Sequence, residues 1–424
     1  MSAAARRFWI NDRTERLFVI LSAIVMLNGL VFLLNTSAAA RDTGDGSMAY
    51  QAVCTAIYGL AFAIALSRPA GVGRLIAANL PLVLFLAYVS LTVLWSVYPG
   101  VSLRRATALI GTTFLAGYAV LRFPLPELLR LYGWAFLVVA VAALAAGLLF
   151  PDIATHTSGR NAGAWNGIYS HKNDLGRAMT LGCLVFLLLL WQERWAKPVW
   201  WLGFLLCLTL IGLSQSKTAY VVTAALLSLL GYIGVSRSFR LPVSVRWLGI
   251  LAVVLSVAVL GAMTVLEDVT SLLGRDMTFT GRTSIWTEVV LQIQQRPWFG
   301  YGYRAFWASD ASAVVYAHVG WNSFGHAHNG FLDLTVETGL VGLGFFLLLC
   351  LMLARRGLAV TRNRPEPVFL LPLGLLVYLF GFGLSAHAFA EHGDLAWVLF
   401  CAALMYGALP LYRTVPLTFE RVPS

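Results

Sequence analysis

Residues 129–150 read LRLYGWAFLVVAVAALAAGLLF, and Arg130 is the only charged residue among them. A helix rises about 1.5 Å per residue and the hydrocarbon layer of a membrane is about 30 Å thick, so a run of about 20 apolar residues can cross it. The stretch therefore predicts a transmembrane helix. Across the whole chain 59% of residues are hydrophobic and 12% are charged, against about 25% charged in an average soluble domain. We expect lipid to be the solvent of the whole protein.

Other stretches have the same apolar character, which predicts an all-α, polytopic membrane protein with about 12 transmembrane helices. The predicted spans are residues 17–37, 49–67, 74–95, 105–121, 129–150, 174–191, 198–213, 217–234, 247–266, 333–354, 367–386 and 394–412. No part of the chain has the composition of a soluble domain, so residues 1–424 are expected to form a single membrane domain.

The first predicted span resembles a signal peptide in one respect. Four arginines precede it and three alanines at 38–40 follow it like a cleavage site. Its apolar stretch is nevertheless longer than the 7–15 residues of a signal peptide. We favour an uncleaved span.

The positions of Lys and Arg predict the orientation in the membrane, because short cytoplasmic loops carry an excess of them. Most of the thirty Lys and Arg residues fall on one side if both termini are cytoplasmic. All seven histidines then fall on the other, outer side. That distribution predicts polar chemistry on the outer face.

Two outer segments, 151–173 and 267–332, are longer than the other connections, and long loops tend to be functional. Within the larger segment, Ile285, Val289 and Ile293 share one face of a predicted helix over 282–295, which Pro297 stops. Such a helix could lie flat on the membrane surface. We expect residues 267–332 to form one large, partly helical periplasmic loop.

Charge and cysteine content exclude two other classes of protein. The net charge of +11 comes from single cations at the ends of apolar runs, whereas a nucleic-acid surface interleaves them with aromatic residues. The five cysteines all lie inside apolar runs without a C-x-x-C spacing. No nucleic-acid partner, disulfide or zinc site is expected.

The most specific pattern runs from His326 to Gly342. It resembles the signature of the O-antigen ligase and polymerase family, which is His, then Asn, Ser or Gln, nine residues, Gly, two residues, and Gly, Thr or Tyr. His328, Asn329, Gly339 and Gly342 match it position by position. Further stretches typical of the family are 95–105, 166–176, 214–218, 281–286 and 296–302. Within the family, residues 166–176 are more similar to the exopolysaccharide polymerases than to the ligases.

The resemblance implies a glycosyltransferase of the bacterial inner (cytoplasmic) membrane whose active site faces the periplasm. Its donor would be a glycan on undecaprenyl pyrophosphate, and its acceptor another lipid-linked glycan, for a polymerase, or lipid A-core, for a ligase. The implied reaction inverts the anomeric configuration and needs no metal or other cofactor. Membrane lipids would surround the protein.

Roles for individual residues follow from this resemblance. His328 would be the general base, because an imidazole with a pKa near 6.5 can accept a hydroxyl proton at neutral pH; Asn329, His326 and Glu337 would orient it or the acceptor. The cations expected to bind the donor pyrophosphate are Arg282, Arg304 and Lys217, followed by Arg177, Lys172 and Arg105. Alternatively, His328 only caps a helix, and the cations extend to lipid phosphates.

Several other patterns have competing interpretations. His326 and His328, with Asp333 or Glu337, could hold a metal, but the spacing matches no common metal motif. The aromatic residues between 298 and 307 could stack on sugars or form an interfacial belt. His387, Glu391, His392 and Asp394 resemble a catalytic group, but we expect them in a solvated loop, which could line the active cavity. A flippase or other transporter would also have about twelve spans, yet would place ionisable residues near mid-membrane.

Overall fold

The computed structural model describes residues 12–28, 47–66, 69–238, 282–319, 325–363 and 366–408. This part of the chain is helical apart from loops and one isolated β-bridge between Thr155 and Trp165. Its α-helices are α1 (Asp12–Met26), α4 (Met48–Leu66), α5 (Pro69–Ala78), α6 (Leu80–Leu91), α7 (Pro99–Arg122), α8 (Leu125–Leu149), α9 (Pro151–Ala154), α10 (Lys172–Gln192), α11 (Pro198–Ser214), α12 (Lys217–Ser238), α14 (Arg282–Gln295), α15 (Ala313–Val319), α16 (Gly330–Asn363), α17 (Leu371–Gly383) and α18 (Leu395–Ala408).

Five of these helices are long and apolar enough to cross a membrane, and a bent pair, α5 with α6, makes a sixth candidate. Three shorter apolar segments, 198–214, 367–383 and 395–408, add to the bundle. The all-α, polytopic architecture is confirmed, whereas the number of spans stays a prediction. The predicted span 247–266 and the second half of the first lie outside the described residues.

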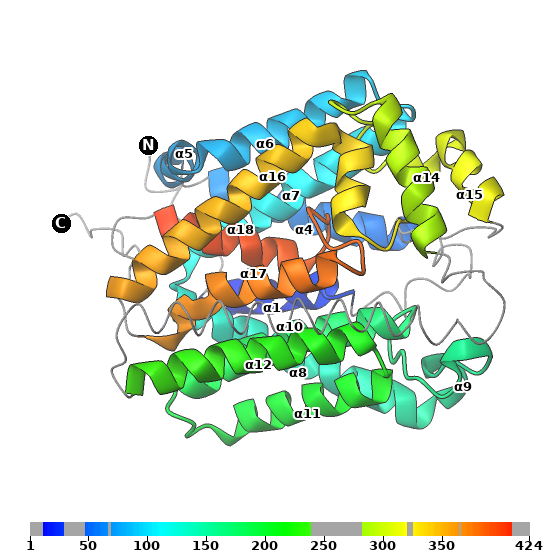
Figure 1. The fold of residues 1–424 in the computed structure, drawn as a ribbon. Helices are drawn as coiled ribbons and strands as arrows, with labels where there is room; N and C mark the ends of the chain where they lie inside the picture. The colour runs from blue at the N-terminus through cyan, green and yellow to red at the C-terminus, as the bar shows by residue number, and fades with distance from the viewer. Residues whose placement is uncertain are drawn as a thin grey trace.

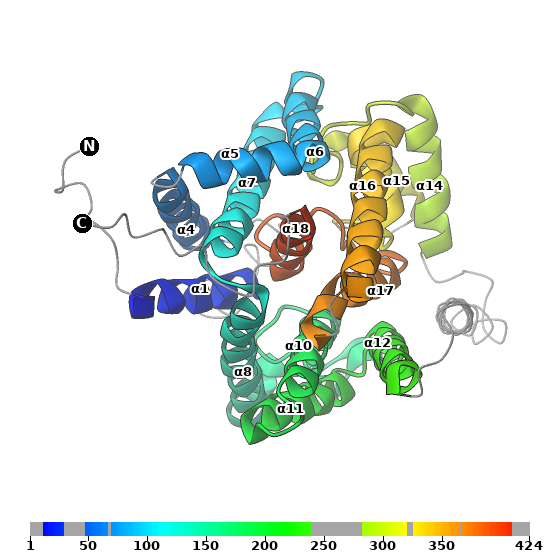
Figure 2. The same ribbon diagram turned by 90° about the vertical axis from the view of Figure 1, so that its left-hand side faces the viewer.

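Helix α18 is the centre of the bundle. Figure 2 shows it surrounded by α7, α8, α10, α16 and α17. Every residue from Leu395 to Tyr406 is buried, and apolar residues occupy all sides of the helix, as expected for a helix with no solvent or lipid face. The long helices run side by side around it (Figure 1).

The predicted single span 74–95 is wrong in one respect, because the chain turns by 87° between α5 and α6. Pro81 follows the break, and a proline cannot donate the backbone hydrogen bond that would continue a helix. Arg356 of α16 stabilises the turn: its Nη1 donates to Asn79 Oδ1 (2.5 Å) and its Nη2 to the Ala78 carbonyl (2.9 Å). A cation from another helix therefore binds the end of α5.

The predicted helix over 282–295 is confirmed by α14. It runs across the ends of the long helices, next to α15 and the start of α16 (Figure 1). Ile285 and Val289 are fully buried, and Trp286 Nε1 donates to the Ala327 carbonyl at 2.9 Å. The helix thus packs on the segment that carries the predicted catalytic histidine.

Candidate active site

The segment of residues 325–329 leads into α16 and holds both histidines of the signature. Asn329 caps the helix, since its Oδ1 accepts hydrogen bonds from the backbone N–H groups of Phe331 (3.0 Å) and Leu332 (3.3 Å). His328 immediately before it has a φ of 53°, a left-handed conformation that is uncommon for a residue with a side chain. The family asparagine therefore fixes the place where the histidine segment meets α16.

Two hydrogen bonds hold this left-handed turn. The His328 N–H donates to His326 Nδ1 (3.1 Å), and the Ala327 N–H donates to Asp333 Oδ1 (2.7 Å). Burial lowers the pKa of His326 below its usual value, so at pH 7 its ring is neutral and Nδ1 can accept. The imidazole rings of His326 and His328 lie edge to face, with their centroids 4.1 Å apart. Backbone strain of this kind tends to occur at functional sites.

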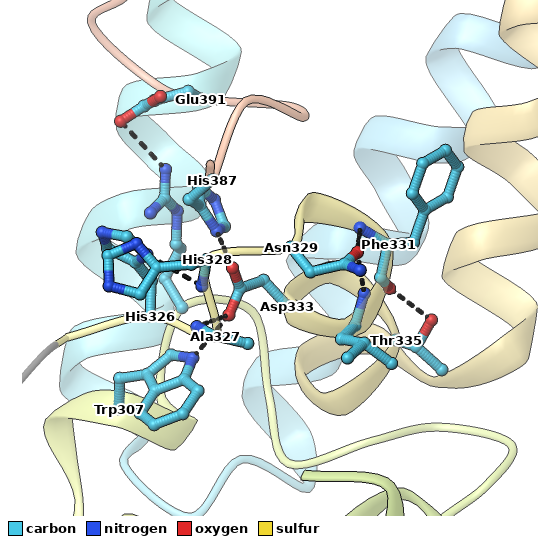
Figure 3. Close-up of polar contacts among 12 residues, drawn as sticks. Trp307, His326, Ala327, His328, Asn329, Phe331, Asp333, Thr335, His387 and Glu391 are labelled. Carbon is cyan, nitrogen blue, oxygen red and sulfur yellow. Dashed lines mark hydrogen bonds and ion pairs between the residues drawn. The ribbon is translucent and has the colours of Figure 1, made fainter. Parts of the chain in front are cut away.

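Asp333, in the first turn of α16, connects the histidine segment to two other parts of the chain. Its side chain is fully buried. Trp307 Nε1 donates to Oδ1 at 2.8 Å, and His387 Nδ1 lies 3.2 Å from Oδ2; Figure 3 shows both contacts. Three segments that are distant in the sequence therefore meet at one carboxylate.

The expectation of a solvated loop around His387 is wrong. His387 is only 7% exposed, and the side chains of Glu391 and Asp394 are 26% and 16% exposed. The loop folds inward because its polar and charged groups have partners there: Asp333 for the His387 imidazole and two arginines for the Glu391 carboxylate. A charge is buried at little cost only when it is paired in this way.

The two arginines are Arg177, in the second turn of α10, and Arg304. Arg177 Nη1 donates to Glu391 Oε2 (2.9 Å), and Arg304 Nη2 lies 3.5 Å from Glu391 Oε1. Burial opposes ionisation of Glu391, but the guanidinium groups of Arg177 and Arg304 outweigh it and hold the pKa of that carboxyl well below its usual range. Burial raises the pKa of the neighbouring Asp394 to about 6. One carboxylate thus joins two of the predicted pyrophosphate ligands.

The other predicted cations have different positions. Arg105 Nη1 donates to the Arg304 carbonyl at 2.6 Å, so it supports Arg304. Lys172 Nζ lies 3.4 Å from the Gln215 carbonyl, and Lys217 is exposed at the start of α12. Arg282 begins α14, but its side chain lies outside what the structure describes.

The two signature glycines have a structural role. Gly339 interrupts α16 with φ 68° and ψ −178°. The freed N–H groups of Leu340 and Val341 donate to the carbonyls of Pro297 (2.8 Å) and Trp298 (3.3 Å). A side chain at Gly339 would overlap Trp298, and one at Gly342 would overlap Thr338. The break therefore anchors the turn that precedes Arg304.

Glu337 and the aromatic residues complete this region. Glu337 is 1% exposed, and its carbonyl accepts from the Gly302 N–H at 2.8 Å. Of the six aromatic residues, three are buried in the packing and one binds Asp333, while Trp298 and Phe299 are 62% and 55% exposed. The sugar-stacking and belt hypotheses therefore concern only these last two.

The sequence did not predict the place of three residues of the site: Asp333 was considered only as a metal ligand, and His387 and Glu391 were expected in a solvated loop. One signal was available, since Asp333 and Glu337 are acids at the start of a predicted span that is apolar from Leu340 onward, and ionisable residues in spans tend to be functional. Within the described ranges, no three His, Cys, Asp or Glu side chains are arranged to hold a metal ion.

Comparisons with known proteins bear on the family of the chain. A family model described as O-Antigen ligase matches residues 202–347, which include Arg304, His328 and Gly339. The chain is 29% identical over 319 residues to the exopolysaccharide production protein ExoQ of Rhizobium meliloti (strain 1021), covering 70% of each chain. It is 24% identical over 241 residues to the general O-oligosaccharyltransferase of Acinetobacter baylyi (strain ATCC 33305 / BD413 / ADP1), covering 51% of this chain and 40% of that one. The resemblance inferred from the signature, to the O-antigen ligase family of membrane glycosyltransferases, is confirmed by the match of residues 202–347 and by these two relatives.

Proposed function

We propose that this protein polymerises polysaccharide repeat units, as an inverting, metal-independent glycosyltransferase at the periplasmic face of the bacterial inner membrane. The observation that carries the proposal is that a strained histidine segment, at His326 and His328, is linked through Asp333 and His387 to a pair of arginines. The similarity to an exopolysaccharide production protein supports a polymerase.

The arginine pair suits a donor on undecaprenyl pyrophosphate. Arg304 Nε and Nη2 are buried and have no hydrogen-bond partner within the described ranges, although Nη2 lies near Glu391. Guanidinium N–H groups match phosphate oxygens in geometry and charge. The apolar helices of the bundle would accommodate the lipid tail of the donor. We infer that Arg304 and Arg177 bind the pyrophosphate and that Arg105 supports Arg304. A contact of Arg282, Lys217 or Lys172 with the donor stays a prediction from the resemblance.

The chemistry then requires a base and a stabilised leaving group. His328 takes the proton of the acceptor hydroxyl while the oxygen of that hydroxyl attacks the anomeric carbon of the donor glycan. The bond from that carbon to the pyrophosphate oxygen breaks, and the arginines stabilise the charge that develops on the leaving group. Attack opposite the leaving group inverts the anomeric configuration. Asn329, His326 and Glu337 keep His328 and its surroundings in place.

A ligase that transfers glycan to lipid A-core is the alternative within the family, supported by the similarity to a general O-oligosaccharyltransferase. A flippase would move its substrate without changing it. The described charged groups of the site lie in the first two turns of α10 and α16 and in loops, which suits an interfacial reaction better than a mid-membrane transport site.

The product of the purified protein distinguishes polymerase from ligase. Given only its lipid-linked repeat unit, the protein is expected to make longer lipid-linked chains, resolved by gel electrophoresis and mass spectrometry. A ligase would leave the repeat unchanged until lipid A-core was added. Transfer to lipid A-core without any chain growth would contradict the polymerase proposal.

Removal of the cations should weaken use of the donor. A charge-assisted hydrogen bond is worth about 1.5–3 kcal/mol, so Arg304→Ala and Arg177→Ala should lower kcat/KM for the lipid-linked donor about 10- to 150-fold. Arg304→Lys should restore only part of this, because it loses the two-pronged contact. Lys217→Ala should cost less, since Lys217 is exposed.

The matched control is Arg130→Ala, which removes an arginine paired with Glu193 (2.7 Å) at the start of α8, away from the site. Thermal unfolding in detergent separates a loss of binding from a loss of folding. Normal kcat/KM at limiting donor in the Arg304 and Arg177 variants would reject the pyrophosphate assignment.

A further inference from the structure

The imidazole of His387 has one nitrogen held by a carboxylate and one without a partner. Nδ1 lies 3.2 Å from Asp333 Oδ2, and neither atom has a hydrogen-bond partner elsewhere in the described ranges. Nε2 is buried and likewise unpartnered there. Buried polar atoms are nearly always satisfied in folded proteins. An unpartnered nitrogen on a 7% exposed residue therefore indicates a group that a ligand completes.

The contacts of Asp333 determine which nitrogen carries the proton. Oδ1 already accepts from Trp307 Nε1 (2.8 Å) and from the Ala327 N–H (2.7 Å), so this carboxylate acts as an acceptor. An acceptor at Oδ2 requires the hydrogen on Nδ1 of His387. In the tautomer with its hydrogen on Nδ1, the imidazole has its lone pair on Nε2. The pair presents a hydrogen-bond acceptor in a buried position.

His387 lies in contact both with Arg177 of the arginine pair and with the carboxylate that holds the histidine segment. Its carbonyl accepts from Arg177 Nη1 at 3.1 Å, and Arg177 also binds Glu391. On the other side, Asp333 binds the peptide N–H next to His328. His387 therefore links Arg177, through its carbonyl, to the histidine segment, through its ring and Asp333; Figure 3 shows the His387 ring next to Asp333.

We propose that Nε2 of His387 accepts a hydrogen bond from a hydroxyl group of the glycan substrate, and that Asp333 is the positioning residue that keeps this nitrogen unprotonated. The proposal rests on the proposed function, since it takes the ligand to be a glycan, whose hydroxyl groups are abundant donors. It adds a residue for substrate recognition beside the base and the phosphate ligands.

Asp333→Asn is the sharpest variant. Its side-chain oxygen must still face Trp307 and Ala327, which both donate, so its NH₂ group faces His387 Nδ1. That N–H donor favours the other tautomer, in which Nε2 carries the hydrogen and can no longer accept. Asparagine has nearly the same shape as aspartate, so the fold should persist. We expect kcat/KM for the lipid-linked glycan to fall about 10- to 100-fold.

Two variants of His387 complete the set. His387→Phe removes both nitrogens and should cause a similar loss, whereas His387→Gln keeps an oxygen acceptor and should retain more activity. His318→Ala is the control, because His318 is an exposed histidine of α15 whose side chain is 62% exposed. Thermal unfolding in detergent identifies any variant that fails to fold.

A spectroscopic measurement tests the tautomer without activity. In protein labelled with ¹⁵N-histidine, with the signal assigned by its loss in His387→Gln, His387 should show a protonated Nδ1, and Asp333→Asn should reverse the pattern. A protonated Nε2 in the wild type, or normal kcat/KM in folded His387→Phe, would overturn the inference. Absence of any glycan transfer by the wild type with a verified donor would instead defeat the proposed function, leaving the tautomer measurement interpretable.

Discussion

His328→Ala should abolish glycan transfer while the protein stays folded and still binds its lipid-linked donor. Proton transfer by a positioned base contributes about 10²- to 10⁴-fold to a rate, and turnover should fall by that factor. No Lys or Arg could replace the imidazole, because both are protonated at pH 7. The side chain is only partly buried, so its removal should leave no large cavity. The measurement is transfer by purified variants in nanodiscs, with donor binding recorded in parallel.

His328→Asn separates the base from the backbone. Asparagine adopts a left-handed conformation more readily than most residues, so it should maintain the φ of 53° but cannot take a proton at neutral pH. Both variants should therefore be inactive, with thermal stability near that of the wild type. Near-normal turnover in either would exclude His328 as the base. Inactivity with a large fall in thermal stability would favour a helix-capping role.

The sequence indicated the candidate residues that lie along one segment, but not the contacts between distant segments. The signature identified His328 and its spacing to Gly339, because a local pattern along one segment is visible in one dimension. The pairing of Asp333 with His387 joins α16 to a loop some fifty residues later, and no periodicity records such a contact. The polar residues of that loop suggested solvent because they normally favour it. Burial became possible only because the carboxylate and arginines of other helices were there to pair with them.

The fold shows the same limit. Hydropathy predicted the long apolar helices, because a bilayer requires satisfied backbone groups and hence helices. It did not predict the 87° turn between α5 and α6, since both halves are apolar and only Pro81 indicated a break. The cation that binds the turn, Arg356, comes from α16. Local composition determines which residues form helices, whereas side chains from distant helices determine where they bend.

Gly339→Ala should destabilise the protein and abolish activity, although Gly339 is no catalytic group. Its φ of 68° and ψ of −178° lie in a region that only glycine occupies readily. An added Cβ would also overlap the Trp298 carbonyl. Backbone strain costs about 1–3 kcal/mol and overpacking a similar amount, so we expect a total of about 2–6 kcal/mol. Thermal unfolding in detergent and glycan transfer should both report the loss.

Gly344→Ala is the matched control in the same helix. Gly344 is exposed and a Cβ there would meet nothing within 4 Å, so alanine should be neutral or slightly stabilising because it favours helix. Unchanged stability and transfer in Gly339→Ala would show that α16 does not need the break. If the prediction holds, the family glycine acts through the turn it anchors: Gly302 donates to the Glu337 carbonyl at 2.8 Å, and Arg304 follows two residues later. The signature would then encode two things at once, the base at His328 and, eleven residues on, the helix break that places the phosphate-binding arginine beside it.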